Sequence, residues 1–170
     1  MAGLTLPSEH LRAGAEYRDT LKRLGLDPEG LLWAYDRSLD AFVLVLVTTH
    51  LDIAGPLKMY RLLTRAYNAS VTPALIDPFI VRLHSPKQEI ARALRDGYGL
   101  DITIGSFVPK DPTIDPSSVS VETRITLDVG DLSFAREWVY QLRDQKIPPA
   151  ERSRHWRRFE KNVEALQIAA

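Results

Sequence analysis

An uninterrupted apolar run, AFVLVLV at Ala41–Val47, dominates the hydrophobic pattern of the first third of the chain. Its alternating valines are β-branched and leucines lie between them, which favours a strand buried on both faces. The apolar LLWAY at Leu31–Tyr35 precedes it, and the polar Asp36–Asp40 between the two runs favours a tight turn. The pattern predicts a hairpin of Leu31–Tyr35 and Ala41–Thr49, with a buried helix as the alternative for so short a run. A membrane-spanning helix is excluded, because a bilayer span needs about 20 apolar residues.

Three helices are predicted before residue 100 from their boundary residues. A helix over Ser8–Leu24 begins with a serine that can cap it, and Gly25 provides its C-terminal stop. Pro56 opens a second helix at its first position, directly after a glycine. Ser85–Gln88 matches a capping box, and the helix that it opens is expected to stop at Gly97. The residues expected on the buried side of the second helix are Leu57, Tyr60, Leu63 and Tyr67.

Three further strands are predicted from the alternation of side chains. Pro78–His84 is one, and in it Arg82 and His84 share a face. Ile102–Val108 is another, and a loop with three prolines follows it. Val119–Val129 alternates strictly between apolar and polar residues, which is typical of an antiparallel strand with one wet face.

Two helices are predicted to end the chain. The first covers about Leu132–Gln145, and the two prolines at 148 and 149 force a break after it. The second presents Trp156, Phe159, Val163 and Leu166 at a spacing typical of a docking face.

The order of these elements predicts one α+β domain over residues 1–170. We expect two layers, in which a mixed and mainly antiparallel sheet of about five strands packs against helices, with a C-terminal helix pair. The segment Gly55–Asn68 is expected to form a parallel crossover between two strands.

Charge and cysteine content narrow the expected class of protein. Lys plus Arg equals Asp plus Glu at 22 each, a balance that is unusual for a nucleic-acid coat and that weakens self-repulsion. Residues 146–170 carry +3 and residues 99–131 carry −4, so opposite patches can meet within one molecule or between two copies. Cysteine is absent, which excludes disulfides and thiolate chemistry. The N-terminus has no secretory signal pattern, and we expect a cytoplasmic protein.

Candidate chemistry lies at the ends of predicted strands. His50 and Asp52 follow the central strand, and a histidine beside a carboxylate can act as a general base. Arg82 and His84 can together hold an anion or a carboxylate. The alternative is that all four have ordinary structural positions. No spacing makes His50, Asp52 and His84 converge on a metal, and no glycine-rich phosphate loop is present, so we expect neither a metal nor a cofactor.

A basic patch is the third candidate site. Lys58, Arg61 and Arg65 form one row on the second helix. The last helix adds Arg154, Arg157 and Arg158 beside Trp156 and Phe159, a mixture that can bind single-stranded nucleic acid if the rings are exposed. The same rings fit the inward stripe of that helix, which makes nucleic-acid binding the least favoured function.

The sequence therefore predicts a binding or assembly module that forms a homodimer. The alternative is a small-molecule-binding protein or enzyme with a pocket near His50, Asp52 and His84. Weak nucleic-acid binding through the basic helices is the third hypothesis.

Overall fold

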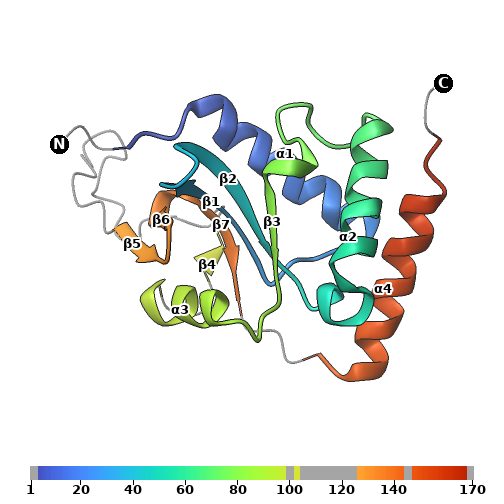
Figure 1. The fold of residues 1–170 in the computed structure, drawn as a ribbon. Helices are drawn as coiled ribbons and strands as arrows, with labels where there is room; N and C mark the ends of the chain where they lie inside the picture. Colours follow the sequence, from blue (N-terminus) through green and yellow to red (C-terminus); the bar gives the residue numbers. More distant parts are fainter. Residues whose placement is uncertain (1–3, 99–101, 104–125, 144–146, 168–170) are drawn as a thin grey trace, which may run out of the picture.

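A computed structural model describes residues 4–98, 102–103, 126–143 and 147–167, and within these ranges seven strands form one mixed sheet (Figure 1). The strands are β1 (Gly30–Asp36), β2 (Ala41–Val47), β3 (Val81–His84), β4 (Ile102–Thr103), β5 (Thr126–Val129), β6 (Leu132–Ala135) and β7 (Val139–Leu142). The helices are α1 (Ser8–Leu24), α2 (His50–Asn68), α3 (Glu89–Tyr98) and α4 (Pro149–Glu164), with short 3₁₀ turns η1 (Pro78–Ile80) and η2 (Arg136–Trp138).

The predicted hairpin is confirmed as the centre of the sheet. β1 and β2 pair antiparallel from Gly30 opposite Val47 to Asp36 opposite Ala41. The Asp36 carboxylate closes the turn by accepting hydrogen bonds from the N–H groups of Ser38 and Leu39, at 2.9 and 3.2 Å. Local polar residues therefore fix the register of the apolar strands.

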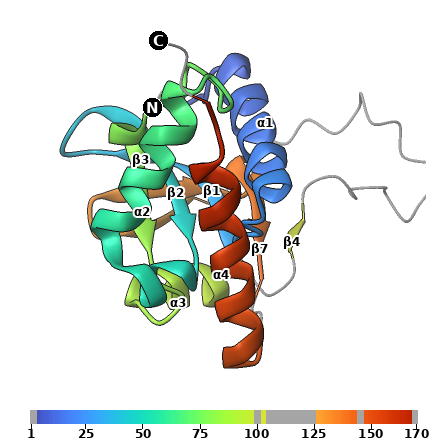
Figure 2. The same cartoon turned by 90° about the vertical axis from the view of Figure 1, so that its right-hand side faces the viewer.

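The sheet is buried on both faces, as the run of alternating valine and leucine predicted. Leu44 and Leu46 point to the face that α1, α2 and α4 cover. Val43, Val45 and Val47 point to the opposite face, where α3 packs (Figures 1 and 2). The prediction of two layers is therefore correct only in part, because α3 forms a third layer over part of the opposite face of the sheet.

The predicted parallel crossover is also confirmed. β3 pairs parallel with β2, from Val81 beside Leu44 to His84 beside Val47, and α2 connects the two strands. Gly55, with φ 79° and ψ 165°, interrupts α2 and separates a first turn that begins at His50 from the main helix. Only glycine adopts this backbone conformation readily. The helical turn before Gly55 was not predicted from the sequence.

The predicted inward face of α2 was largely wrong. Leu63 is buried, but Leu57 is 75% exposed, and Tyr60 and Tyr67 are only half-buried. Two apolar stripes overlap on this helix, and the packing against the sheet and α4 selects one of them. The side chains that are buried instead are Met59, Leu62, Leu63 and Ala66.

The first helix of the predicted C-terminal pair was wrong. The described residues of Leu132–Gln145 form β6, η2 and β7 instead. β6 pairs with β1 at Tyr35 and Asp36, and β7 pairs with the other half of β1 at Gly30–Leu32. The 3₁₀ turn between them shifts the side-chain alternation, so the apolar positions fall at helix-like spacing although they lie on strands. β5 and β4 pair with the outer edges of β6 and β7.

Helix boundaries agree with the prediction in part. Gly25 has φ 104° and ends α1, with the Leu26 N–H bonded to the Leu21 carbonyl at 2.8 Å. The cap residue of α1 is Pro7, however, and Ser8 makes no side-chain capping bond. At Ser85 the side-chain bonds form, from the Lys87 N–H to Ser85 Oγ and from the Ser85 N–H to Gln88 Oε1, but they close a turn and α3 begins only at Glu89. The helix also continues through Gly97, where a Cβ would approach Leu127 closely.

Two predicted strands lie mostly outside the described residues. Only Ile102–Thr103 of the segment Ile102–Val108 is described, and it forms β4. Only Thr126–Val129 of the segment Val119–Val129 is described, and it forms β5. The predicted loop at 109–118 and most of the acidic segment at 99–131 fall outside the described ranges as well.

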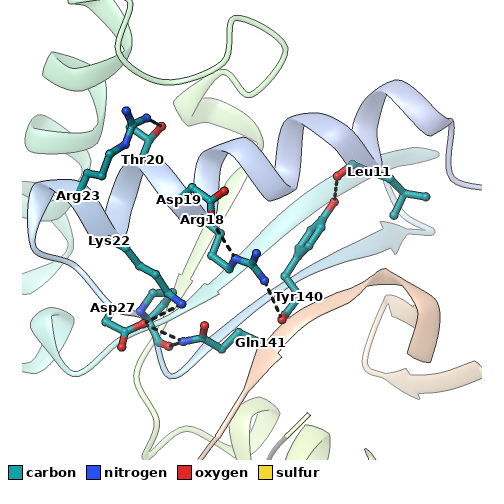
Figure 3. A network of polar contacts seen from close by, with 10 residues as sticks. Leu11, Arg18, Asp19, Thr20, Lys22, Arg23, Asp27, Tyr140 and Gln141 are labelled. Atoms are coloured by element: carbon teal, nitrogen blue, oxygen red, sulfur yellow. Dashed lines mark hydrogen bonds and ion pairs between the residues drawn. The ribbon is translucent and has the colours of Figure 1, made fainter. Parts of the chain in front are cut away.

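Polar contacts join α1 to β7 across the covered face of the sheet (Figure 3). The Tyr140 hydroxyl donates to the Leu11 carbonyl at 2.6 Å and accepts from Trp33 Nε1 at 3.0 Å. The Tyr140 ring lies so close to the backbone of Gly14 that a Cβ there would overlap it. Gly14 is therefore needed for close approach, even though glycine lowers helix propensity.

Among the helices in the described ranges, none has both the length and the apolar character that crossing a bilayer requires.

Candidate functional site

The structure separates the residues that the sequence offered as a site. His50 begins α2 and is buried, whereas Asp52, two residues later, is exposed. His84 ends β3, where its Nδ1 lies 2.9 Å from the Gln88 side-chain oxygen. Arg82 donates from Nη1 to the Phe79 carbonyl at 2.8 Å. His50 lines a hollow to which none of the other three contributes.

The hollow around His50, the His50 hollow, has a volume of about 400 Å³. Three parts of the chain form it: the segment between α1 and β1, the junction of β2 with α2, and the first half of α4 together with Ile147, two residues before that helix. The lining residues are Gly25, Asp27, Glu29, Thr49, His50, Ile147, Glu151, Arg152 and His155. The hollow lies where β2 and the parallel strand β3 end, a position where ligands often bind in sheet proteins.

His50 is held by aromatic side chains from α4. Its imidazole is 5% exposed and packs edge-on against Trp156 and Phe159, at centroid distances of 5.6 and 5.8 Å. Neither ring nitrogen has a hydrogen-bond partner of ordinary geometry in the described part of the chain, although the backbone of His155 lies nearby. Burial, followed by the neighbouring charge of His155, lowers the pKa of His50 to about 4. The ring is therefore neutral near pH 7 and keeps a free acceptor lone pair.

Glu29 places a buried carboxylate in the same hollow. It is 3% exposed, and its two oxygens accept hydrogen bonds from Thr49, at 3.1 Å from the N–H and 3.0 Å from the hydroxyl. Thr49 is the residue before α2, so Glu29 caps this helix from a distant part of the chain. Burial raises the pKa of Glu29 in spite of these bonds and of the charge of Arg143.

Asp27 is held in place by partners outside the His50 hollow. Gln141 donates from Nε2 at 3.0 Å, Lys22 lies 3.8 Å away, and Arg143 forms an ion pair (Figure 3 shows the first two). Partial burial alone would raise the pKa of Asp27, but the bonds from Gln141 and Arg143 and the two positive charges lower it overall. Asp27 therefore remains ionised, and its charge is offset locally.

Three side chains of α4 form the remaining polar wall. His155 Nε2 lies 3.7 Å from the Glu151 carboxylate, one turn away on the helix. Arg152 is directed to the chain before the helix, since its Nε donates to the Ile147 carbonyl at 2.8 Å. These groups are half-buried, so the His50 hollow is polar at its mouth and aromatic behind the imidazole.

The chemistry available in the His50 hollow is hydrogen bonding and proton transfer. A neutral imidazole can accept a proton, and a carboxyl with a raised pKa can donate one. The hydroxyl of Thr49 is engaged with Glu29. Across the described residues, no three His, Asp or Glu side chains converge in a way that could hold a metal ion.

The predicted basic patch is divided by the packing of α2 on α4. Lys58 contacts Glu160 and lies 5.5 Å from the Trp156 ring centroid. Arg65 donates to carbonyl groups at the end of α4, including that of Leu166 at 3.0 Å. Trp156 and Phe159 are buried, as their inward spacing predicted. The exposed members of the patch are Arg61, Arg154, Arg157 and Arg158.

Most of the residues around His50 were missed from the sequence. Glu29 lies in a short polar segment that reads as a loop, and nothing local indicates that it is buried. Glu151, Arg152 and His155 were considered only as part of a charged helix. Their common position depends on α4 packing beside the start of α2, which is a tertiary contact.

The sequence matches no protein-family model, and neither the curated proteins nor the solved structures contain a significant match to it.

Proposed function

We propose that this α+β domain binds a small polar molecule in the His50 hollow. The observation that carries this proposal is the buried imidazole of His50, which lines the hollow and has no hydrogen-bond partner of ordinary geometry among the described residues, with only the His155 backbone nearby. A buried polar group without a partner costs about 1–3 kcal/mol. A ligand that donates a hydrogen bond to His50 would recover that cost on binding.

Two further features support binding at this position. The volume of about 400 Å³ falls within the range of small-molecule pockets. The polar groups Glu29 and Thr49 are fixed to each other and to the start of α2, so they are pre-organised. Because these groups are already fixed at the ends of regular elements, ligand binding does not have to include the entropic cost of ordering them.

The proposal is tested by titrating a diverse set of small polar compounds into the protein and following the ring signals of His50 by NMR. We expect at least one compound to shift these signals and to raise the melting temperature. The variant His50→Phe should abolish the thermal shift, while His84→Gln, which changes a histidine outside the hollow, should preserve it. If every compound that binds does so equally well in both variants, the site lies elsewhere.

We propose self-association as a second function, through an apolar face on α2 and η1. Leu57 and Phe79 are 75% and 87% exposed, and Ile53, in the short helical turn before Gly55, is 43% exposed. Phe79 and Tyr60, a residue on the same side of α2 as Leu57, line one shallow hollow of about 490 Å³. Large exposed apolar side chains on two elements that pack together, α2 and η1, are typical of interaction surfaces.

A second copy of the chain is the occupant that the surrounding charges favour. Asp77 and Arg82 line the hollow beside Phe79, and Asp52 and Arg61 are exposed on α2. A two-fold interface brings the same patch against itself, so a rim with both signs of charge is self-complementary. The zero net charge of the chain also weakens repulsion between copies. Sedimentation velocity over a concentration series tests this, and a single monomer species at all concentrations would contradict it.

A further inference from the structure

The charges around the His50 hollow favour a positively charged ligand. Three carboxylates and one guanidinium line it, a formal charge of −2 with the histidines neutral. Lys22 and Arg143 lie outside the hollow beside Asp27, and the charge of Arg143 also acts on Glu29, whereas Arg152 is the cation of the lining itself. Arg152 is itself directed to the Ile147 carbonyl. The lining is therefore deficient in positive charge.

The hydrogen-bonding groups that line the hollow are mainly acceptors. The neutral ring of His50 has one acceptor nitrogen, and the carboxylate of Glu29, which receives two bonds from Thr49 and one from its own backbone, has a further lone pair that can accept. Glu151 adds a half-exposed carboxylate. An ammonium or guanidinium group has several donors and no acceptor, so it complements this arrangement.

An anionic ligand fits the same place poorly. The start of α2 is the obvious attraction for an anion, because backbone N–H groups and the helix dipole favour negative charge. Glu29 already occupies that position through its bond to the Thr49 N–H. A ligand carboxylate or phosphate would lie against this buried carboxylate, and like charges at short range repel.

We propose that the His50 hollow recognises a small organic cation with a primary ammonium or guanidinium group, an inference that rests on the binding function proposed above. The charged group donates hydrogen bonds to Glu29 and to the acceptor nitrogen of His50. Ile147 provides an apolar contact for the body of the ligand. A buried carboxylate whose charged form is destabilised by burial gains most from a cation, because the ligand replaces the lost solvation.

A series of probes with the same carbon skeleton and different charge tests this. The probes are 4-aminobutan-1-ol, butane-1,4-diol and 4-hydroxybutanoate, supplemented by butylguanidine as a guanidinium probe, at pH 7 and constant ionic strength. We expect the His50 ring signals to shift with the two cations alone. Glu29→Gln should weaken the binding of both cations at least tenfold. Glu151→Gln should also weaken it, but by less. Glu89→Gln, which removes an exposed carboxylate on α3, should leave it unchanged.

Each other outcome has a definite meaning. Binding of the diol or the hydroxybutanoate with a shift at His50, and none with the cations, overturns the cation inference but leaves the binding function standing. Binding of cations that is unchanged in both Glu29→Gln and Glu151→Gln also overturns the inference. If none of the probes and none of the wider set of polar compounds affects His50, both proposals fail. Circular dichroism melts verify that Glu29→Gln folds, and Glu151→Gln on the outer wall serves as the second variant.

Discussion

Replacing His50 by phenylalanine should flatten the dependence of stability on pH between pH 6.5 and 4. The imidazole has a pKa of about 4 in the folded chain and an ordinary value of 6.5. In this interval the unfolded chain binds a proton at residue 50 and the folded chain does not. Since the unfolded state then binds more protons, the free energy of unfolding falls as the pH falls.

The size of the effect follows from the two pKa values. They differ by about 2.5 units, and each unit corresponds to about 1.36 kcal/mol. Protonation of His50 should therefore remove about 3 kcal/mol of stability by pH 4, with most of the loss between pH 6 and 4.5. For a domain whose total stability is about 5–15 kcal/mol, this is a large fraction.

Other groups also titrate in this interval, and comparison with the variant separates them from His50. His84 has a lowered pKa and acts in the same direction, whereas the raised pKa of Glu29 acts in the opposite one. The charged neighbours of His50 on α4 are His155, Glu151 and Arg152. All of these remain in His50→Phe, so the difference between the two proteins isolates the imidazole, apart from the direct effect of its charge on His155.

The assay is urea unfolding followed by far-ultraviolet circular dichroism at pH 7.5, 6.5, 5.5 and 4.5. At pH 7.5 we expect the variant to be as stable as the parent protein or more stable, because a phenyl ring can make the same edge-on contacts with Trp156 and Phe159 and has no buried nitrogen that needs a partner. At pH 4.5 the variant should be more stable by about 2–3 kcal/mol. Two stability curves that stay parallel from pH 7.5 to 4.5 would refute the reasoning, since His50 would then be solvated or protonated in the folded state.

Three other predictions concern packing and assembly. Gly14→Ala should destabilise the protein by about 1–3 kcal/mol in urea unfolding, because the new methyl group overlaps Tyr140, whereas alanine in an open helix position would stabilise it by about 1 kcal/mol. Tyr140→Phe should cost about 1 kcal/mol in the same assay, since it removes the hydroxyl that donates to the Leu11 carbonyl, whereas the Trp33 N–H keeps the His10 carbonyl at 3.1 Å as an acceptor. Leu57→Ser with Phe79→Ser should reduce the mass in sedimentation velocity to that of a monomer. The free energy of unfolding of that double variant should change by no more than about 0.5 kcal/mol per site. As a control, Leu39 is exposed on the turn between β1 and β2, and Leu39→Ser should not change the mass.

The parts of the fold that were predicted correctly carry their own local signals. The run at Ala41–Val47 alternates two apolar residue types and is flanked by turn residues, so a strand was predictable and its burial on both faces followed. Gly25 ended α1 as predicted because a left-handed residue after a helix is a property of the local backbone. The side-chain bonds at Ser85 formed for the same reason, although they close a turn before α3 and do not cap its first residue.

The errors occurred where tertiary packing selects between two local patterns. In α2, the stripe through Leu57 and the stripe through Met59 are both apolar, and only the position of the sheet and α4 decides which is buried. The segment Leu132–Leu142 has helix-like apolar spacing, but it forms β6 and β7. These two strands pair with β1 along the edge that β2 leaves open. The sequence contains no information at short range about that edge.

The candidate site shows the same division between local and tertiary information. His50 was predictable as a candidate because it follows a buried strand, and strand ends often bear functional side chains. Its separation from Asp52 follows from the helical turn before Gly55, which directs neighbouring side chains to different sides. Glu29 joined the site through a hydrogen bond across 20 positions of the chain, which no spacing rule anticipates.

The energetics of His50 distinguish a residue retained for folding from one retained for binding. His50 stabilises the fold through its ring contacts with Trp156 and Phe159. A phenyl ring would make the same kind of contact without burying two nitrogens. Glu29 differs, because its carboxylate caps α2 and so contributes to folding even though burial disfavours its charge. If His50→Phe is at least as stable as the parent protein, the imidazole costs stability in the free protein. Such a cost is typical of binding residues, because a group that waits for a ligand is left without a partner until the ligand arrives.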